Sequence, residues 1–366
     1  MDSTRCASGN EFDGRMGLRI SSIFVILVGS ALGALFPVYA ARHRGVGVPE
    51  WAFFAAKYFG SGVILATSFI HLLAPAHDAL TNECLTGPIT EYDWVEGICL
   101  MSIFALFFLE LMTMRFAKFG HEHGAAHGHD HEHGPLGMTA DSDATVSDIK
   151  NQEGSTAELN MASRSTQCPS SPFVPGDDHL SHSREHPRSP GPDPHSKTFD
   201  PESYGAQMTA VFILEFGVIF HSIFIGLTLA VAGSEFTTLY TVLAFHQTFE
   251  GLALGSRLGT MDWPESKRFT PYLMALGYAL STPLAIAIGL GVRKTFDPNS
   301  QTTLVVNGVF DSISAGILIY TGLVELMAHE FMFSSYMQRA PLRVVLGAVG
   351  LMALGALLMA LLGKWA

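Results

Sequence analysis

The hydrophobic residues of this chain fall into eight blocks of roughly 20 residues each, separated by short polar connections and one long one. The blocks cover residues 18–40, 51–75, 95–116, 206–232, 236–258, 270–292, 303–328 and 342–363. A helix of about 20 apolar residues spans a bilayer, and lipid favours helices because the backbone must satisfy its own hydrogen bonds there. The pattern therefore predicts an all-α polytopic membrane protein with eight transmembrane helices.

Between residues 117 and 205 the composition changes to Ser, Pro, Gly, Asp and His. Such a segment cannot bury enough apolar area to offset the entropy of ordering, so we predict a long disordered loop between the third and fourth helices. Its first part offers six imidazoles for exchangeable metal binding: His121, His123, His127, His129, His131 and His133. A solvated linker that binds metal only incidentally is the alternative, and the sequence leaves both open.

The basic residues of the connections predict how the helices are oriented, because cytoplasmic loops are enriched in Lys and Arg. The first, third, fifth and seventh connections hold most of these basic residues: Arg42, Arg44, Arg115, Lys118, Arg257, Lys267, Arg268, Arg339 and Arg343. This distribution places the His-rich loop in the cytoplasm and both termini outside, with residues 1–17 as an extracellular tail. Arg5 and Arg15 in that tail, and Arg19 just after it, point the other way. The net charge of −12 gives no reason to expect nucleic acid as a partner.

Two of the four cysteines would lie outside the cell in this orientation. A disulfide between Cys6 and Cys84 is predicted for that compartment, with two free thiols as the alternative. Cys99 and Cys168 are expected to be reduced.

Ionisable residues within the blocks are costly, at about 2.5–3.5 kcal/mol each on insertion scales, and by default they mark a pathway. The stretch FHQTFEG in the fifth block puts His246 and Glu250 four residues apart, on one helix face. The fourth block adds His221, so three ligands of the type that zinc prefers are available. A short connection makes the two helices antiparallel, which brings both histidines to a similar depth near the midplane, where secondary transporters bind their substrates.

The other polar residues of the blocks carry weaker signals. Two pairs share a helix face, Ser68 with His71 and Glu325 with His329. A lone intramembrane histidine such as His71 can equally be a satisfied interhelical hydrogen bond. Near helix ends, Glu215 and Asp311 are expected to face headgroups or water.

Two motifs give the chain a resemblance to a known family. HSIFIG at 221–226 and HQTFEG at 246–251 are similar to paired motifs of the ZIP family of divalent metal transporters, and NEFDGRMGLRISSIFVIL and DSISAGILIYTGLVEL resemble its fungal zinc permeases. The resemblance implies a 3+2+3 arrangement of spans with an inverted repeat. It also implies elevator-like movement of the fourth and fifth spans with their neighbours. On this basis the chain divides into residues 1–17, 18–116, 117–205, 206–258 and 270–363.

The resemblance also implies a metal site. His221, His246 and Glu250 match the primary ligands, with Ser222 and Gln247 beside them. Some relatives hold a second metal through acidic residues, and the matching positions here are Ile225, Gln247 and Thr282, so a single metal is expected. The polar positions that the family uses on the way toward the cytoplasm match His71, Glu325 and His329. Ser68, which shares a helix face with His71, is assigned to the same predicted transport pathway.

The predicted function is uptake of Zn²⁺, or of Fe²⁺ by the same ligands, across the plasma membrane into the cytosol, with no catalytic cofactor. The expected partners are the metal ion, the lipid bilayer and a ubiquitin ligase acting on the loop through Lys118, Lys150 or Lys197. Glycines of the last span could pack within the bundle or in a homodimer. The alternatives are an intramembrane zinc hydrolase, for which no HExxH motif is present, a metal exporter, and a metal sensor that does not transport.

Overall fold

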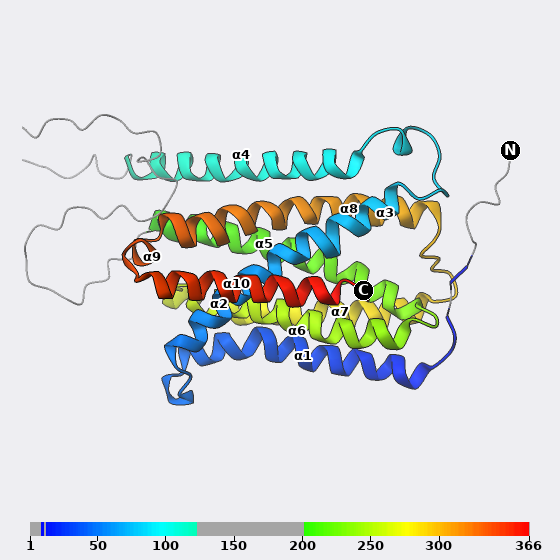
Figure 1. Cartoon of the computed structure of the whole chain (residues 1–366), viewed down its shortest axis with the longest axis horizontal. Coiled ribbons are helices and arrows are strands. Elements are labelled where there is room, and N and C mark those ends of the chain that lie inside the picture. The colour runs from blue at the N-terminus through cyan, green and yellow to red at the C-terminus, as the bar shows by residue number, and fades with distance from the viewer. Residues whose placement is uncertain (1–8, 11, 123–200, 366) are drawn as a thin grey trace, which may run out of the picture.

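The computed structural model describes residues 9–10, 12–122 and 201–365, and these residues form a bundle of long helices (Figure 1). No strand occurs among them, so the all-α prediction is confirmed for this part of the chain. His121 lies at the end of a described helix, whereas the other five loop histidines, Cys6, Cys168 and most of the predicted N-terminal tail lie outside the described residues.

Every predicted apolar block corresponds to a helical span. Six blocks give single helices, namely α1 (Met16–Arg42), α4 (Trp94–Glu122), α5 (Pro201–Val231), α6 (Phe236–Thr260), α7 (Thr270–Val292) and α10 (Leu342–Leu362). The second block gives α2 (Glu50–Ala66), η2 (Thr67–Leu73) and α3 (Ala74–Leu80), and the seventh gives α8 (Gln301–Tyr320) and η5 (Thr321–Phe333), followed by the short α9 (Ser335–Arg339).

Seven of the described spans are long and apolar enough to cross a membrane. The exception is α6, whose mean hydropathy is lowered by polar side chains, including His246, Gln247 and Glu250. Its 25 residues still extend for about 37 Å at 1.5 Å per residue, which is long enough to span a bilayer. The one described span that fails on composition is thus the span that carries two of the three predicted ligands.

The second and seventh spans are each interrupted by a π-helical stretch, η2 and η5. Such stretches are rare and often occur at functional sites. Pro75, just after η2, has no N–H to donate to the His71 carbonyl four residues earlier, which favours a local change of helix type. The polar pairs singled out in the sequence lie within these stretches, Ser68 and His71 in η2 and Glu325 and His329 in η5.

The most extensive helix contacts define two groups. The first group is α1, α5, α6 and α7, in which α1 packs on α6 and α7, and α5 packs on α7. The second group is α2, η2, α3, α4, α8, η5 and α10, in which α2 packs on α10 and α8 packs on α3 and α4. The groups meet mainly where α6 touches α2 and where α5 touches α8. The consecutive helices α5 and α6 contact each other less than they contact these neighbours.

Glycines allow the closest of these approaches. In the first group, a Cβ added at Gly33 would lie 2.5 Å from the Thr248 carbonyl oxygen, and one at Gly255 would collide with the Ala34 carbonyl. In the second group, Gly355 of α10 packs in the same way on the backbone of Phe59. Small residues at such crossings increase van der Waals contact between helices in a membrane. Gly355 therefore serves packing within the bundle, and the homodimer stays a prediction.

The N-terminal segment is anchored by Arg19, whose side chain is fully buried. Its guanidinium donates to the carbonyls of Leu229, Ala230 and Ala232 at the end of α5, at 3.2, 2.9 and 2.5 Å, and pairs with Asp13 at 2.8 Å. Hydrogen bonds from Arg15 and then Arg19 lower the pKa of the Asp13 carboxyl. Arg19 thus satisfies carbonyls that a helix end leaves unpaired. This structural role explains why Arg19 runs against the charge pattern of the loops.

The N-terminal segment and Cys84 lie at the same end of the bundle. Asn10 donates to the Phe296 carbonyl at 2.8 Å, and Gln301 donates to the Cys84 carbonyl at 3.0 Å. Cys84 is disulfide-bonded. Because Cys6 lies outside the described residues, the pairing of these two cysteines stays a prediction.

Candidate metal centre

Three of the predicted ligands converge between α5 and α6. One ligand atom each from His221, His246 and Glu250 lies within 4.8 Å of the other two. His246 Nε2 and Glu250 Oε1 are 3.2 Å apart, because residues four apart on a helix project to the same side. The three residues are no more than 2% exposed.

These buried groups lack the hydrogen bonds that buried polar atoms normally make. Among the described residues, both ring nitrogens of His221, Nε2 of His246 and both carboxylate oxygens of Glu250 have no hydrogen-bond partner. Leaving such a group unsatisfied costs about 1–3 kcal/mol. A tetrahedral zinc with bonds of about 2.1 Å would hold its ligand atoms about 3.4 Å apart, close to the observed spacing of His246 and Glu250. The donor set and its unsatisfied atoms fit a divalent cation.

The ligands lie about halfway through the bundle. His221 is ten residues before the end of α5 at Val231, and His246 is ten residues after the start of α6 at Phe236. At 1.5 Å per residue, both lie about 15 Å from the end of the bundle that carries residues 232–235, which we call the 232–235 end. A hydrocarbon core is about 30 Å thick, so this is the depth of its midplane. Glu250 lies about one turn farther from that end.

Ser222 and Gln247 tie the two ligand helices together. Gln247 Nε2 donates to Ser222 Oγ at 3.2 Å, and the Tyr278 hydroxyl of α7 donates to the Gln247 backbone carbonyl at 2.6 Å. The side chains of Ser222 and Gln247 are fully buried. This arrangement fixes α5, α6 and α7 relative to one another beside the ligands.

The second span brings His71 to the same place. Its ring centroid lies 4.6 Å from that of His246, and its Nε2 lies 2.9 Å from the Met359 carbonyl of α10. His71 therefore makes an interhelical hydrogen bond and also borders the site. Ser68 instead donates to the Leu65 carbonyl in its own span at 2.7 Å, so its hydroxyl is used there.

Asp311 also lies at the site, and the expectation that it lies near a helix end, facing headgroups or bulk water, is wrong. Its Oδ1 is 3.7 Å from His221 Nδ1, and its side chain is 14% exposed. The helix α8 begins at Gln301, ten residues earlier, which places Asp311 at the same depth as the histidines. The same expectation is wrong for Glu215, which is 7% exposed and fourteen residues into α5. Counting residues from the first residue of each apolar block, at 1.5 Å per residue, would have predicted the depth of both carboxylates in the membrane.

A cavity of about 270 Å³ leads from the site toward the 232–235 end. Around the site it is lined by His71, His221, His246, Asn307 and Asp311, and nearer the end by Ala79, Thr228 and Leu239. The site is thus reached from that side through a space large enough for a hydrated ion.

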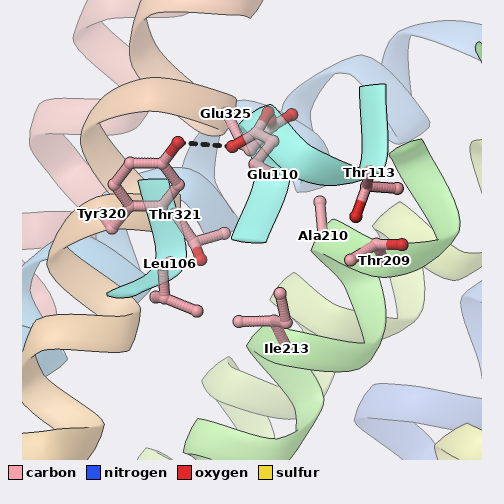
Figure 2. Close-up of a pocket in the computed structure, with 9 residues that line it drawn as sticks. All are labelled: Leu106, Glu110, Thr113, Thr209, Ala210, Ile213, Tyr320, Thr321 and Glu325. Atoms are coloured by element: carbon pink, nitrogen blue, oxygen red, sulfur yellow. Dashed lines mark hydrogen bonds between the residues drawn. The ribbon is translucent and has the colours of Figure 1, made fainter. Parts of the chain in front are cut away.

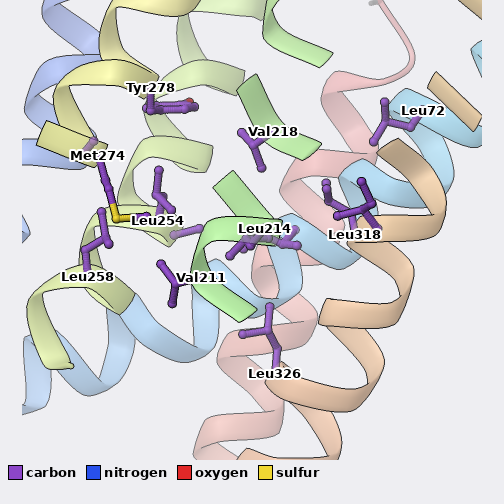
Figure 3. Close-up of a cluster of buried hydrophobic side chains, with 14 of the residues drawn as sticks. Leu72, Val211, Leu214, Val218, Leu254, Leu258, Met274, Tyr278, Leu318 and Leu326 are labelled. Atoms are coloured by element: carbon purple, nitrogen blue, oxygen red, sulfur yellow. The ribbon is translucent and has the colours of Figure 1, made fainter. Parts of the chain in front are cut away.

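On the other side of the ligands, apolar side chains fill the bundle (Figure 3). Leu214 and Val218 of α5, Leu254 and Leu258 of α6, and Leu326 of η5 are each at most 3% exposed. Close-packed aliphatic side chains leave no path for an ion with its hydration shell. Within the described residues, the site is therefore accessible from one end and closed toward the other.

Beyond this apolar layer lies a polar cluster at the opposite end (Figure 2). Glu325 Oε2 is 3.2 Å from His329 Nδ1 and 3.9 Å from an Arg257 nitrogen. Tyr320 donates a hydrogen bond to Glu110 beside them, next to a cavity of about 20 Å³, which is room for about one water. The sequence pointed to Glu325 and His329, but it gave no reason to expect Arg257, which reaches Glu325 from the first group of helices.

Comparisons with known proteins find relatives over nearly the whole chain. Residues 16–363 match the family model described as ZIP Zinc transporter. The chain is 44% identical to zinc-regulated transporter 2 of Saccharomyces cerevisiae, with 99% of this chain and 97% of the relative aligned. It is 39% identical to zinc-regulated transporter 1 of Schizosaccharomyces pombe, over 98% of this chain and 88% of the relative. It is 29% identical to zinc transporter 3 of Arabidopsis thaliana, over 99% of this chain and 89% of the relative.

Proposed function

The chain belongs to the ZIP family of zinc transporters, and we propose that it carries Zn²⁺ from outside the cell into the cytosol through a site formed by His221, His246 and Glu250. The observation that carries this proposal is the group of buried, unpartnered ligand atoms at mid-membrane depth, two of whose residues, His221 and His246, line a cavity that opens toward one end. Imidazole and carboxylate ligands suit Zn²⁺ and Fe²⁺ better than Mg²⁺ or Ca²⁺, and the matching family model and the Arabidopsis thaliana relative are named as zinc transporters. The comparisons give no support to a hydrolase or a sensor.

The 232–235 end faces outward in this proposal, and the membrane is the plasma membrane. The basic residues of the connections support this orientation, because Arg257, Lys267, Arg268, Arg339 and Arg343 gather at the opposite end. Of the basic residues near the 232–235 end, Arg15 and Arg19 are engaged with Asp13 and the end of α5, and Arg293 donates to the Leu290 carbonyl. With this proposed orientation, the structure represents the outward-accessible state.

Transport then requires movement that opens the cytoplasmic side. The first group of helices carries the three ligands and moves against the second group, which supplies His71, Glu325 and His329 along the path. The separate packing of the two groups supports this division, and the 3+2+3 order with its inverted repeat is part of the proposal. The contact between Arg257 and Glu325 joins the groups at the cytoplasmic end, so it must break before metal can pass there.

The His-rich loop is proposed to receive metal on the cytoplasmic side and to expose lysines to a ubiquitin ligase. Deleting residues 121–195 should leave uptake intact and slow the removal of the transporter from the surface at high zinc. Loss of uptake in this deletion would make the loop part of the path itself.

Uptake of zinc and iron into liposomes that contain the purified protein tests the proposed function. Wild-type protein should accumulate zinc in preference to iron, and His221→Ala should be inactive at equal protein density. Equal uptake by the variant and the wild-type protein would remove His221 from the site. No uptake by the wild-type protein would contradict transport altogether.

A further inference from the structure

We propose that Asp311 forms an outer station, a first binding site for a divalent cation, from which the ion passes to His221. Asn307, one helix turn nearer the 232–235 end on α8, forms it together with Asp311. Both side chains line the cavity that reaches the site, and residues four apart share one face of a helix. The inference rests on the proposed function, since it adds a step before the ion reaches Glu250.

The distance between Asp311 and His221 fits a shared cation better than a hydrogen bond. Oδ1 and Nδ1 are 3.7 Å apart, beyond the 2.7–3.2 Å of hydrogen bonds to nitrogen and near the roughly 3.4 Å that a tetrahedral zinc would impose. Neither atom has a hydrogen-bond partner among the described residues. His221, His246 and Glu250, whose ligand atoms all lie within 4.8 Å of one another, form what we call the inner site. Asp311 is not part of that group and lies next to it.

The order of the two carboxylates along the cavity gives the station its place on the path. Asp311 is the one acidic residue among the described residues that line the cavity. Glu250 is not part of that lining and lies about one turn deeper than His246. A cation that enters from the 232–235 end therefore meets the Asp311 carboxylate first. In a low-dielectric surrounding this charge attracts the cation and offsets part of the cost of losing its water.

The two carboxylates also belong to different groups of helices. Asp311 lies on α8 of the second group, whereas His221, His246 and Glu250 lie on α5 and α6 of the first group. An ion held between Asp311 and His221 joins the groups, so it must leave Asp311 before they can move apart. Asp311 thus captures the ion in the outward-accessible state and does not travel with it.

This role predicts a change in KM with little change in kcat. Asp311→Asn keeps the shape of the side chain and removes its charge, and in liposomes it should raise the KM for zinc about tenfold while kcat stays within about twofold of wild type. Glu235→Gln is the matched control, because Glu235 is an exposed carboxylate at the same end and outside the cavity. An unchanged KM in Asp311→Asn, or an equal rise in both variants, would overturn the proposal.

Binding of Co²⁺ to the purified chain, followed by its absorption spectrum, tests the station separately. Glu250→Gln should keep weak binding through Asp311 and His221, and adding Asp311→Asn to it should abolish that binding. Equal binding by the single and double variants would overturn the station. Loss of all Co²⁺ binding in Asp311→Asn alone would also overturn it, because Asp311 would then belong to the inner site. If His221→Ala abolishes uptake while Asp311→Asn behaves as wild type, the proposed function stands without the station.

Discussion

Replacing Glu250 by Gln removes the negative charge of the proposed site while nearly preserving the volume of the side chain. Glu250 is 2% exposed, so water has little room to replace the lost oxygen ligand. The new amide would also lie close to His246 Nε2, now 3.2 Å from the carboxylate, and could donate a hydrogen bond to the nitrogen that metal needs. Both effects act against metal binding.

The magnitude follows from the position of Glu250. Removing a partner that only orients a metal ligand typically costs 10–100-fold in affinity. Glu250 is placed as a ligand itself, so its loss should raise the Kd for Zn²⁺ by at least about 100-fold, or about 2.8 kcal/mol at 1.4 kcal/mol per tenfold. The fold should not suffer, because both carboxylate oxygens are buried without hydrogen bonds and their charge is costly without metal.

Competition with a chromophoric zinc chelator measures the affinity, and the melting temperature of the metal-free protein reports the fold. Glu215→Gln is the matched control, because it makes the same chemical change at a carboxylate that is 7% exposed on α5 and outside the three-ligand group. The control should bind zinc as the wild-type protein does. A Kd for Glu250→Gln within about threefold of wild type, or an equal loss in the control, would refute the assignment of Glu250 as a ligand.

Three further predictions concern packing, anchoring and pH. Gly255→Ala should destabilise the protein by about 1–3 kcal/mol, because its Cβ meets the Ala34 carbonyl, whereas Gly350→Ala, with open space around it, should not; equal melting temperatures would contradict this packing. Arg19→Met should cost about 2 kcal/mol or more by leaving the carbonyls at the end of α5 unpaired, and an unchanged melting temperature would count against the anchor. Zinc uptake should fall on acidification, because protons compete with metal for imidazole nitrogens, and uptake that rises on acidification would contradict His221 and His246 as ligands.

The sequence by itself determined the helical spans and the face on which His246 and Glu250 stand. Both properties are local, since an apolar block of sufficient length specifies a membrane helix and a spacing of four fixes a shared face. The motif around His221 added the third ligand by resemblance. Even α6, the least apolar span, is predicted, because residues 236–258 form a block long enough to span a bilayer.

Tertiary structure alone decided which residues from distant segments meet. Asp311 lies 3.7 Å from His221, Arg257 reaches Glu325, and η2 and η5 interrupt their spans just where the polar pairs lie. The first two contacts have no local signal, because each depends on how two groups of helices pack and at what depth each helix begins. For the same reason, only the packed structure shows a site open to one end and closed by aliphatic side chains toward the other.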